Sequence, residues 1–266
     1  MRTVLDATAS AHLDTQVSLG VVRDFELRDR GKPVELPAAS QRLLALLALL
    51  ARPTPRSLVS ATLWPDADEQ HAGASLRSAL WRIAALPGPA LVRTCGTGLA
   101  LAEHVVVDLH GLLPDAQQVL ATRQPPPRLF AAGEALRRLG GDLLTGWYDE
   151  WVVEERDRFR QLRLYSLDVI GTALLDGGRA GEALQVALAL VEADPLRESG
   201  HRLLLSVHLQ EGNVAEAVRQ HDRYARLLDR ELGVQPSELM AALLHRYRTG
   251  ADATVLGRRD TAVTVA

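Results

Sequence analysis

The sequence contains a single lysine, Lys32, and a single cysteine, Cys95, among its 266 residues. Lys32 lies in a turn between two short segments predicted as strands, so it cannot serve as the lysine of a P-loop, a Schiff base or a kinase site. One cysteine cannot form an internal disulfide, which is typical of a reducing cytoplasm. No Ser-His-Asp arrangement or carboxylate pair stands out either, so we expect the protein not to be an enzyme.

Aromatic residues make up only 4% of the sequence, whereas Leu and Ala are abundant. This composition favours helices packed on helices over a β-sandwich. The apolar run at residues 43–50 is too short to span a membrane, and residues 1–16 lack the apolar core of a signal peptide. We therefore expect a cytoplasmic protein without a membrane partner.

The sequence also lacks a large excess of charge of either sign, because it has 30 basic and 33 acidic residues and a net charge of −3. The exception is residues 71–98, which contain Arg77, Arg82 and Arg93 and no acidic residue. Any affinity for nucleic acid must therefore come from this local patch, and it should be modest for one protomer.

Residues 66–86 are predicted to form a helix that organises the first half of the chain. Asp66 and Glu69 have the spacing of a capping box, and Pro87 with Gly88 prevents continuation. An apolar stripe (Ala72, Leu76, Leu80 and Ile83) marks the buried side. The opposite side carries Ser75, Arg77, Ser78, Trp81 and Arg82. Small hydroxyls and guanidinium groups on one helix face are typical of a helix in a DNA major groove, although an ordinary solvated helix has a similar pattern.

The segments around this helix predict a winged helix-turn-helix. Short strands are expected at 17–22, 25–28 and 33–36, and helices at 41–51, capped by Ser40, and at 56–64. Strands at 90–94 and 99–101 form a hairpin, the wing, around two glycines. Arg93 and Thr97 of the wing could reach the sugar-phosphate backbone or a minor groove, and Arg56 and Ser57 could hold a phosphate at a helix start. Trp81 could touch a sugar or a thymine methyl group, although we expect it to cover the wing or the loop before its helix. We expect Cys95 to be a free thiol.

Beyond residue 107 the sequence is helical throughout. Helices are expected at 109–122 and 129–139, followed by a long helix after Gly146 and a last helix at 236–247. Residues 178–184 recur at 212–218, a shift of 34 residues, which is the tetratricopeptide period. Gly171, Ala183 and Pro195 also follow the spacing of that repeat. His201 and His208 are two helical turns apart, too far for one ion, so we expect no metal and no cofactor. Trp147, Tyr148 and Trp151 are expected to pack between the two domains.

The predicted fold class is mainly α with a small β component. The predicted domains are a disordered leader at 1–16, a winged-helix DNA-binding domain at 17–107, a helical-repeat domain at 108–248 and a disordered tail at 249–266.

Five short motifs are shared with a known family. They are Leu-Trp-Pro-Asp at 63–66, Ala-Ser-Leu-Arg-Ser-Ala-Leu-Trp-Arg at 74–82, Gly-Trp-Tyr at 146–148, Ala-Asp-Pro-Leu-Arg-Glu at 193–198 and Asp-Arg-Glu-Leu-Gly-Val at 229–234. On these motifs the chain resembles the Streptomyces antibiotic regulatory protein (SARP) family of transcriptional activators. Its members join an OmpR-type winged helix to a bacterial transcriptional activation domain, and larger members add an ATPase module.

The resemblance implies a homodimer that binds direct repeats in promoter DNA and recruits RNA polymerase through its σ factor or α subunit. It further implies control of a secondary-metabolite gene cluster. In OmpR-like proteins the loop at 65–71 meets polymerase, which gives Asp66, Asp68 and Glu69 this role, besides helix capping. The chain departs from the family at Ala84, where an arginine is common, and at Leu99, where an aromatic residue is common. The alternative is a repeat-protein scaffold whose winged helix has lost DNA binding.

Overall fold

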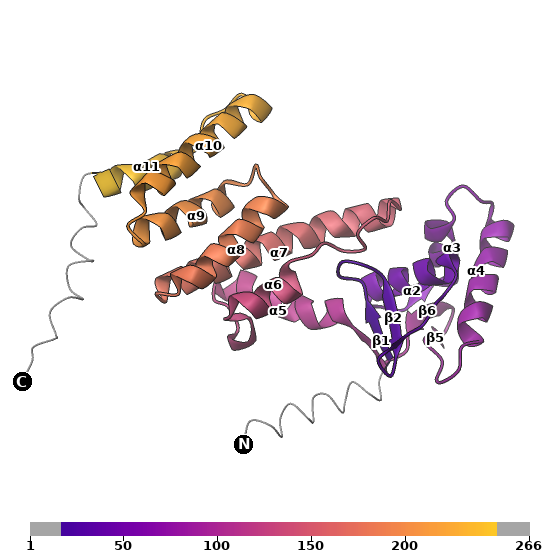
Figure 1. The fold of residues 1–266 in the computed structure, drawn as a ribbon. Helices are drawn as coiled ribbons and strands as arrows, with labels where there is room; N and C mark the ends of the chain where they lie inside the picture. The colour runs from indigo at the N-terminus through magenta and orange to yellow at the C-terminus, as the bar shows by residue number, and fades with distance from the viewer. Residues whose placement is uncertain (1–16, 249–266) are drawn as a thin grey trace, which may run out of the picture. The chain divides into compact units, whose positions relative to one another are not determined.

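A computed structural model describes residues 17–248 of the chain, so the predictions for 1–16 and 249–266 lie outside the described residues. The described part forms two compact units (Figure 1). The first contains the chain up to Gln117 together with Gly141–Leu162, and the second contains Gln118–Gly140 and the chain from Arg163 onward. Helices predominate and the few strands are short, so the predicted fold class is confirmed. Within residues 17–248, no helix combines the length and apolar character needed to cross a membrane.

The first unit begins with a four-stranded sheet in the order β3-β2-β1-β7. The strands are β1 (Val17–Gly20), β2 (Glu26–Asp29), β3 (Lys32–Pro33) and β7 (Val105–Val107). β1 runs antiparallel to β2 and parallel to β7. Val17 and Leu19 of β1 are buried, as the alternation of a half-buried strand requires. The strands predicted at 17–22 and 25–28 correspond to β1 and β2, whereas the third prediction, 33–36, overlaps β3 only at Pro33. The three-residue strand β7 is not predicted.

Three helices and a second sheet complete the winged helix. The helices are α2 (Ala38–Leu50), α3 (Arg56–Leu63) and α4 (Glu69–Ala84), and the strands β4 (Thr54–Pro55), β5 (Val92–Cys95) and β6 (Gly98–Leu101) follow the order β4-β6-β5. Leucine side chains of α2 pack in the core with Val59, Leu63 and Leu76. α2 begins at Ala38, so the predicted cap at Ser40 is wrong. Ser40 is buried inside the helix, and its hydroxyl donates to the carbonyl of Ala79 at 3.3 Å.

The first unit also includes residues that follow the predicted boundary at 107. Asp108, the first residue of α5 (Asp108–Thr122), accepts hydrogen bonds from the backbone N–H groups of Val21 and Val22, both at 3.0 Å. The segment after residue 140 runs beside the same stretch, where the Leu144 N–H donates to the Val21 carbonyl at 2.9 Å. The compact first unit is therefore larger than the predicted 17–107 domain.

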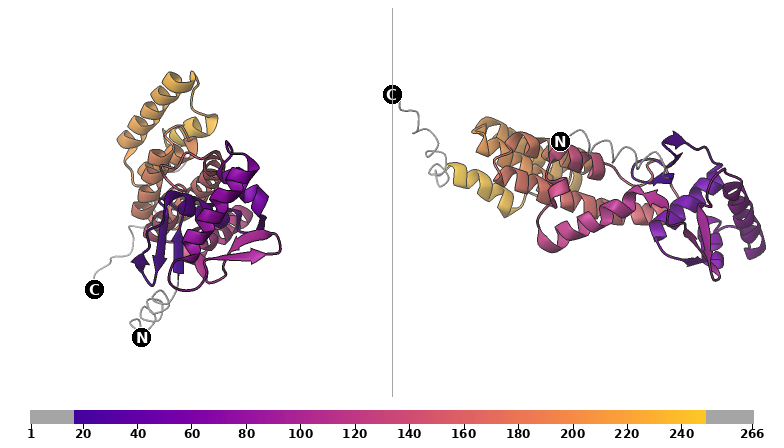
Figure 2. Two further views of the ribbon diagram at one scale, coloured as in Figure 1. Left: turned by 90° about the vertical axis from the view of Figure 1, so that its right-hand side faces the viewer. Right: turned by 90° about the horizontal axis from the view of Figure 1, so that it is seen from below.

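The second unit consists of stacked helices (Figures 1 and 2). Its elements are η1 (Pro127–Leu129), α6 (Ala132–Leu139), the later turns of α7 (Glu150–Asp176), α8 (Ala180–Ala193), α9 (Glu198–Gln210), α10 (Val214–Leu232) and α11 (Glu238–Arg248). Ala183 and Ala217, the equivalent alanines of the two repeats, are both fully buried. Gly171 approaches its neighbours so closely that a Cβ atom there would lie 2.4 Å from Cδ2 of Leu203. Small residues thus set the distances between helices, as the repeat spacing predicts.

Candidate nucleic-acid interface

The helix α4 begins at Glu69, one residue after its N-cap Asp68. The Asp68 carboxylate accepts the backbone N–H of His71 at 2.8 Å and also contacts Nδ1 of His71 at 2.8 Å. These hydrogen bonds, the backbone one first, lower the pKa of Asp68. The cap predicted at Asp66 is therefore wrong, because Asp68 takes that role two residues later. Asp66 is left exposed in the loop before the helix.

The two faces of α4 are as the helical periodicity predicts. Ala72, Leu76, Ala79 and Ile83 are buried, and Leu80 is partly buried. Arg77, Ser78 and Arg82 are exposed, whereas Ser75 is half-buried. In the described part of the chain, no acidic side chain pairs with Arg77 or Arg82. Both guanidinium groups are therefore free to bind an anion.

Trp81 is 70% exposed on the same face of α4. The expectation that it covers the wing or the preceding loop is therefore wrong. Its neighbours Arg77, Ser78 and Arg82 lie within about one turn of the helix, so the indole forms part of one surface with them. An exposed indole beside unpaired guanidinium groups is typical of a binding surface rather than of a solvated helix face.

The start of α3 lies beside the wing, because β4 pairs with β6 of the hairpin. The Arg56 N–H donates to the Thr97 carbonyl at 3.3 Å, and its guanidinium donates to the Thr94 hydroxyl at 3.3 Å. The β4–β6 approach depends on Gly98, where a Cβ atom would lie 3.1 Å from the Thr54 carbonyl oxygen. The fold thus brings Arg56 and Thr97 together. Arg56, Ser57 and Thr97 are all exposed.

Arg93 of the wing is held along its own hairpin. Its Nε donates to the Leu101 carbonyl at 3.3 Å, and a second nitrogen donates to Sγ of Cys95 at 2.9 Å. The guanidinium also lies 3.8 Å from the carboxylate of Glu103, which is almost fully exposed. Such an exposed ion pair contributes little free energy, so Arg93 can exchange these partners for a phosphate at small cost. Cys95 is a free, half-buried thiol, as expected.

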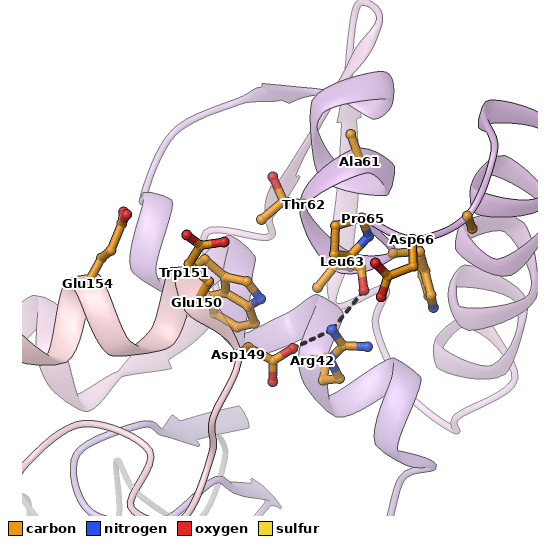
Figure 3. A pocket seen from close by; sticks show the side chains of 12 residues that line it. Arg42, Ala61, Thr62, Leu63, Pro65, Asp66, Asp149, Glu150, Trp151 and Glu154 are labelled. Carbon is orange, nitrogen blue, oxygen red and sulfur yellow. Dashed lines mark hydrogen bonds and ion pairs between the residues drawn. The ribbon is translucent and has the colours of Figure 1, made fainter.

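The loop between α3 and α4 borders an open groove of about 900 Å³ (Figure 3). Pro65 and Asp66 form one side, and Asp149 with Glu150, Trp151 and Glu154 of the first turns of α7 forms the other. Arg42 joins the two sides, since its guanidinium donates to the Leu63 carbonyl at 2.7 Å and forms an ion pair with Asp149. The groove is therefore acidic, and it adjoins Asp66 of the loop.

The sequence pattern does not reveal the pair Arg42 and Asp149, because the two residues are 107 positions apart and no local pattern links them. The prediction for Trp147, Tyr148 and Trp151 is packing between domains. Trp147 of the predicted 108–248 domain does stack on Phe25 of the predicted 17–107 domain, with ring centroids 5.9 Å apart, and Trp151 packs edge-on against Trp147. The prediction is wrong for Tyr148, which is 85% exposed.

Comparisons with known proteins place this architecture in a family. Residues 107–248 match the family model of the bacterial transcriptional activator domain. The chain is 31% identical over 239 residues to Regulatory protein AfsR of Streptomyces coelicolor, an alignment that covers 86% of this chain and 23% of that protein. It is 28% identical over 236 residues to Regulatory protein AfsR of Streptomyces griseus, covering 86% of this chain and 24% of that protein. The chain thus spans about a quarter of the length of these curated relatives.

The fold resembles that of Mycobacterium tuberculosis EmbR, solved in complex with a low affinity phosphopeptide. The TM-score is 0.69 at 20% sequence identity, and the match covers 93% of this chain and 72% of the EmbR chain. This likeness extends across both compact units and concerns the fold alone. Since the family model covers more than half of the 266 residues, the chain belongs to the bacterial transcriptional activator domain family.

Proposed function

We propose that this chain binds direct repeats in promoter DNA as a homodimer, with α4 in the major groove. The exposed face of α4 carries the proposal, because it combines Arg77, Ser78, Trp81 and Arg82 with an absence of acidic residues from 71 to 98. Arginine pairs with guanine edges or with phosphates, and an indole can contact a sugar or a thymine methyl group. Arg56, Ser57, Arg93 and Thr97 would hold the flanking phosphates.

The second part of the proposal is that the protein recruits RNA polymerase, through the σ factor or the α subunit. Asp66 of the α3–α4 loop and Glu69 at the start of α4 are exposed to solvent, and the acidic groove adjoins the loop. Carboxylates in this position suit a basic surface on polymerase. Asp68 would take part less directly, since its carboxylate already caps α4. We place the protein in the bacterial cytoplasm, and by its family we propose a secondary-metabolite gene cluster as its target.

The decisive experiment first selects bound genomic fragments with the purified protein and then measures affinity for them by gel shift. Arg82→Ala should weaken binding about tenfold, the loss of one good base or phosphate contact. Arg158→Ala is the matched control, because Arg158 is an exposed arginine on another helix of the first unit, α7. Unchanged affinity in Arg82→Ala, with an intact circular dichroism spectrum, would favour the scaffold alternative.

The polymerase part needs a separate readout. Asp66→Asn combined with Glu69→Gln should leave promoter affinity unchanged and lower transcription in vitro, because both carboxylates lie outside the proposed DNA face. Equal transcription by the double variant and the unmodified protein would remove the loop from polymerase contact.

A further inference from the structure

The second unit contains a groove that takes no part in the DNA binding or the polymerase recruitment proposed for the first unit. It has a volume of about 560 Å³ and lies between α8 and α10, with α9 beneath it. Leu188 and Val191 of α8 line one wall, Leu204 of α9 lies at the floor and Leu227 of α10 lies on the other wall. Leu188 is 52% exposed, an unusual position for a leucine on an otherwise well-packed helix.

The floor of this groove is rigid. The ring of His201 is buried and stacks on Tyr224 with ring centroids 4.1 Å apart. Nε2 of His201 donates to the Pro195 carbonyl at 2.8 Å, and Nδ1 accepts from Gln220 at 2.8 Å. The Tyr224 hydroxyl donates to the Leu196 carbonyl at 3.1 Å. Every polar group of this cluster is satisfied within the protein, so the groove is formed before any ligand enters.

Three arginines of α10 border the groove: Arg223, Arg226 and Arg230. All three are exposed, and the residues that line the groove include no acidic side chain. Arg223 donates to Gln220, and Arg226 donates to the backbone carbonyl of Asp222. Arg230 pairs with Glu231 in an exposed contact, which is easily exchanged. The groove therefore offers an apolar floor under a rim of positive charge.

We propose that this groove binds an acidic amphipathic helix of a partner protein. The three arginines follow the spacing i, i+3 and i+7, which spans about 10 Å along α10. Glutamates on one face of a helix recur with the same spacing, so a partner helix lying along α10 can pair one carboxylate with each arginine. Its apolar residues would pack against Leu188, Leu204 and Leu227. A DNA backbone also supplies negative charge, but it has no apolar face for this floor.

The test uses the full chain and a fluorescein-labelled peptide of about 20 residues, long enough to form a helix. The peptide carries Glu at positions i, i+3 and i+7 with Leu on the adjoining face, and its partner probe has each Glu replaced by Gln. Fluorescence anisotropy should show saturable binding of the Glu peptide that weakens as salt is raised, and at least tenfold weaker binding of the Gln peptide.

The test variant is Arg223→Gln/Arg226→Gln/Arg230→Gln, and the matched control is Arg137→Gln/Arg158→Gln/Arg219→Gln, which removes the same charge from exposed arginines outside the groove. The test variant should lose at least tenfold in affinity for the Glu peptide and the control less than twofold. Leu188→Ser should also weaken binding, because the wall of the groove loses an apolar side chain. The proposal is overturned if the Glu peptide does not bind, if the two triple variants behave alike, or if the test variant loses promoter affinity but retains the peptide.

Discussion

For Trp81, the sequence pattern predicts the position of the side chain on α4 but not its surroundings. Helical geometry places the indole away from the apolar stripe of α4, but it does not say whether another element covers it. The side chain is 70% exposed, so it contributes little to the stability of the first unit. A large exposed aromatic ring between two arginines stabilises a complex when a binding partner covers it. We therefore include Trp81 in the proposed DNA surface.

His201 is the second informative residue, because its protonation is linked to the stability of the repeat unit. Its two hydrogen-bond partners correspond to a neutral imidazole that donates from Nε2, and burial lowers its pKa below the ordinary value of 6.5. Between the folded pKa and 6.5 the unfolded chain binds a proton and the folded chain does not. The free energy of unfolding therefore falls as the pH is lowered through this window.

We expect His201→Gln to remove this contribution. The variant should be less stable than the unmodified chain at pH 8, where the neutral ring is fully favourable, and the difference should shrink towards pH 5. Urea unfolding monitored by circular dichroism measures both values. A constant difference between His201→Gln and the unmodified chain at both pH values would contradict the linkage.

At the scale of the element, the short strand β4 decides where α3 begins relative to the wing. Its pairing with β6 favours Gly98, because a Cβ atom there would lie only 3.1 Å from the Thr54 carbonyl oxygen and backbone cannot move aside cheaply. The proposed phosphate contacts of Arg56 and Thr97 depend on this pairing, since it holds the two residues side by side.

Gly98→Ala should therefore destabilise the first unit by about 1–3 kcal/mol, the typical cost of overpacking. It should also weaken promoter binding, because the wing moves away from α3. Gly133→Ala is the control, as Gly133 is exposed within α6 and a Cβ atom there would meet nothing within 4 Å. Thermal melts and gel shifts measure the two effects, and equal melting temperatures for the two variants would show that the wing accommodates the methyl group.

The repeat helices provide a second test at this scale. Ala183→Leu should cost about 1–3 kcal/mol, because the alanine is fully buried where helices of the repeat meet. Ala215→Leu is the matched control, since Ala215 is exposed in the equivalent motif 34 positions from Gly181. Transcription in vitro should fall in Ala183→Leu while the winged helix stays folded. Melting of both units together would show that they share one cooperative core.

At the scale of the whole molecule, the first compact unit extends beyond the predicted domain boundary. The sequence predicts a domain that ends at residue 107, and the family match begins there. The compact first unit nevertheless includes Gly141–Leu162, which supplies Leu144 beside Val21 and Asp149 beside Arg42. The chain therefore leaves the first unit after Gln117 and returns to it after Gly140.

We expect a fragment of residues 17–162 to be more stable than one of residues 17–107. The longer fragment retains Asp108, whose carboxylate satisfies two backbone N–H groups at the end of β1, and a buried donor without a partner costs about 1–3 kcal/mol. Urea unfolding of both fragments measures the difference. Equal stability would support the boundary at 107, and Asp108→Asn in the longer fragment isolates the contribution of this carboxylate.

The sequence by itself determined the helices of this protein, the two faces of α4, the hairpin of the wing and the repeat of the second unit. These features follow from periodicity, caps and turns, which act between residues a few positions apart. Only the tertiary structure decided that β4 and β7 exist, because strands of two or three residues are stable only through partners far along the chain. It also decided that residues after 140 return to the first unit, and that Trp81 remains uncovered, since burial depends on which distant elements meet.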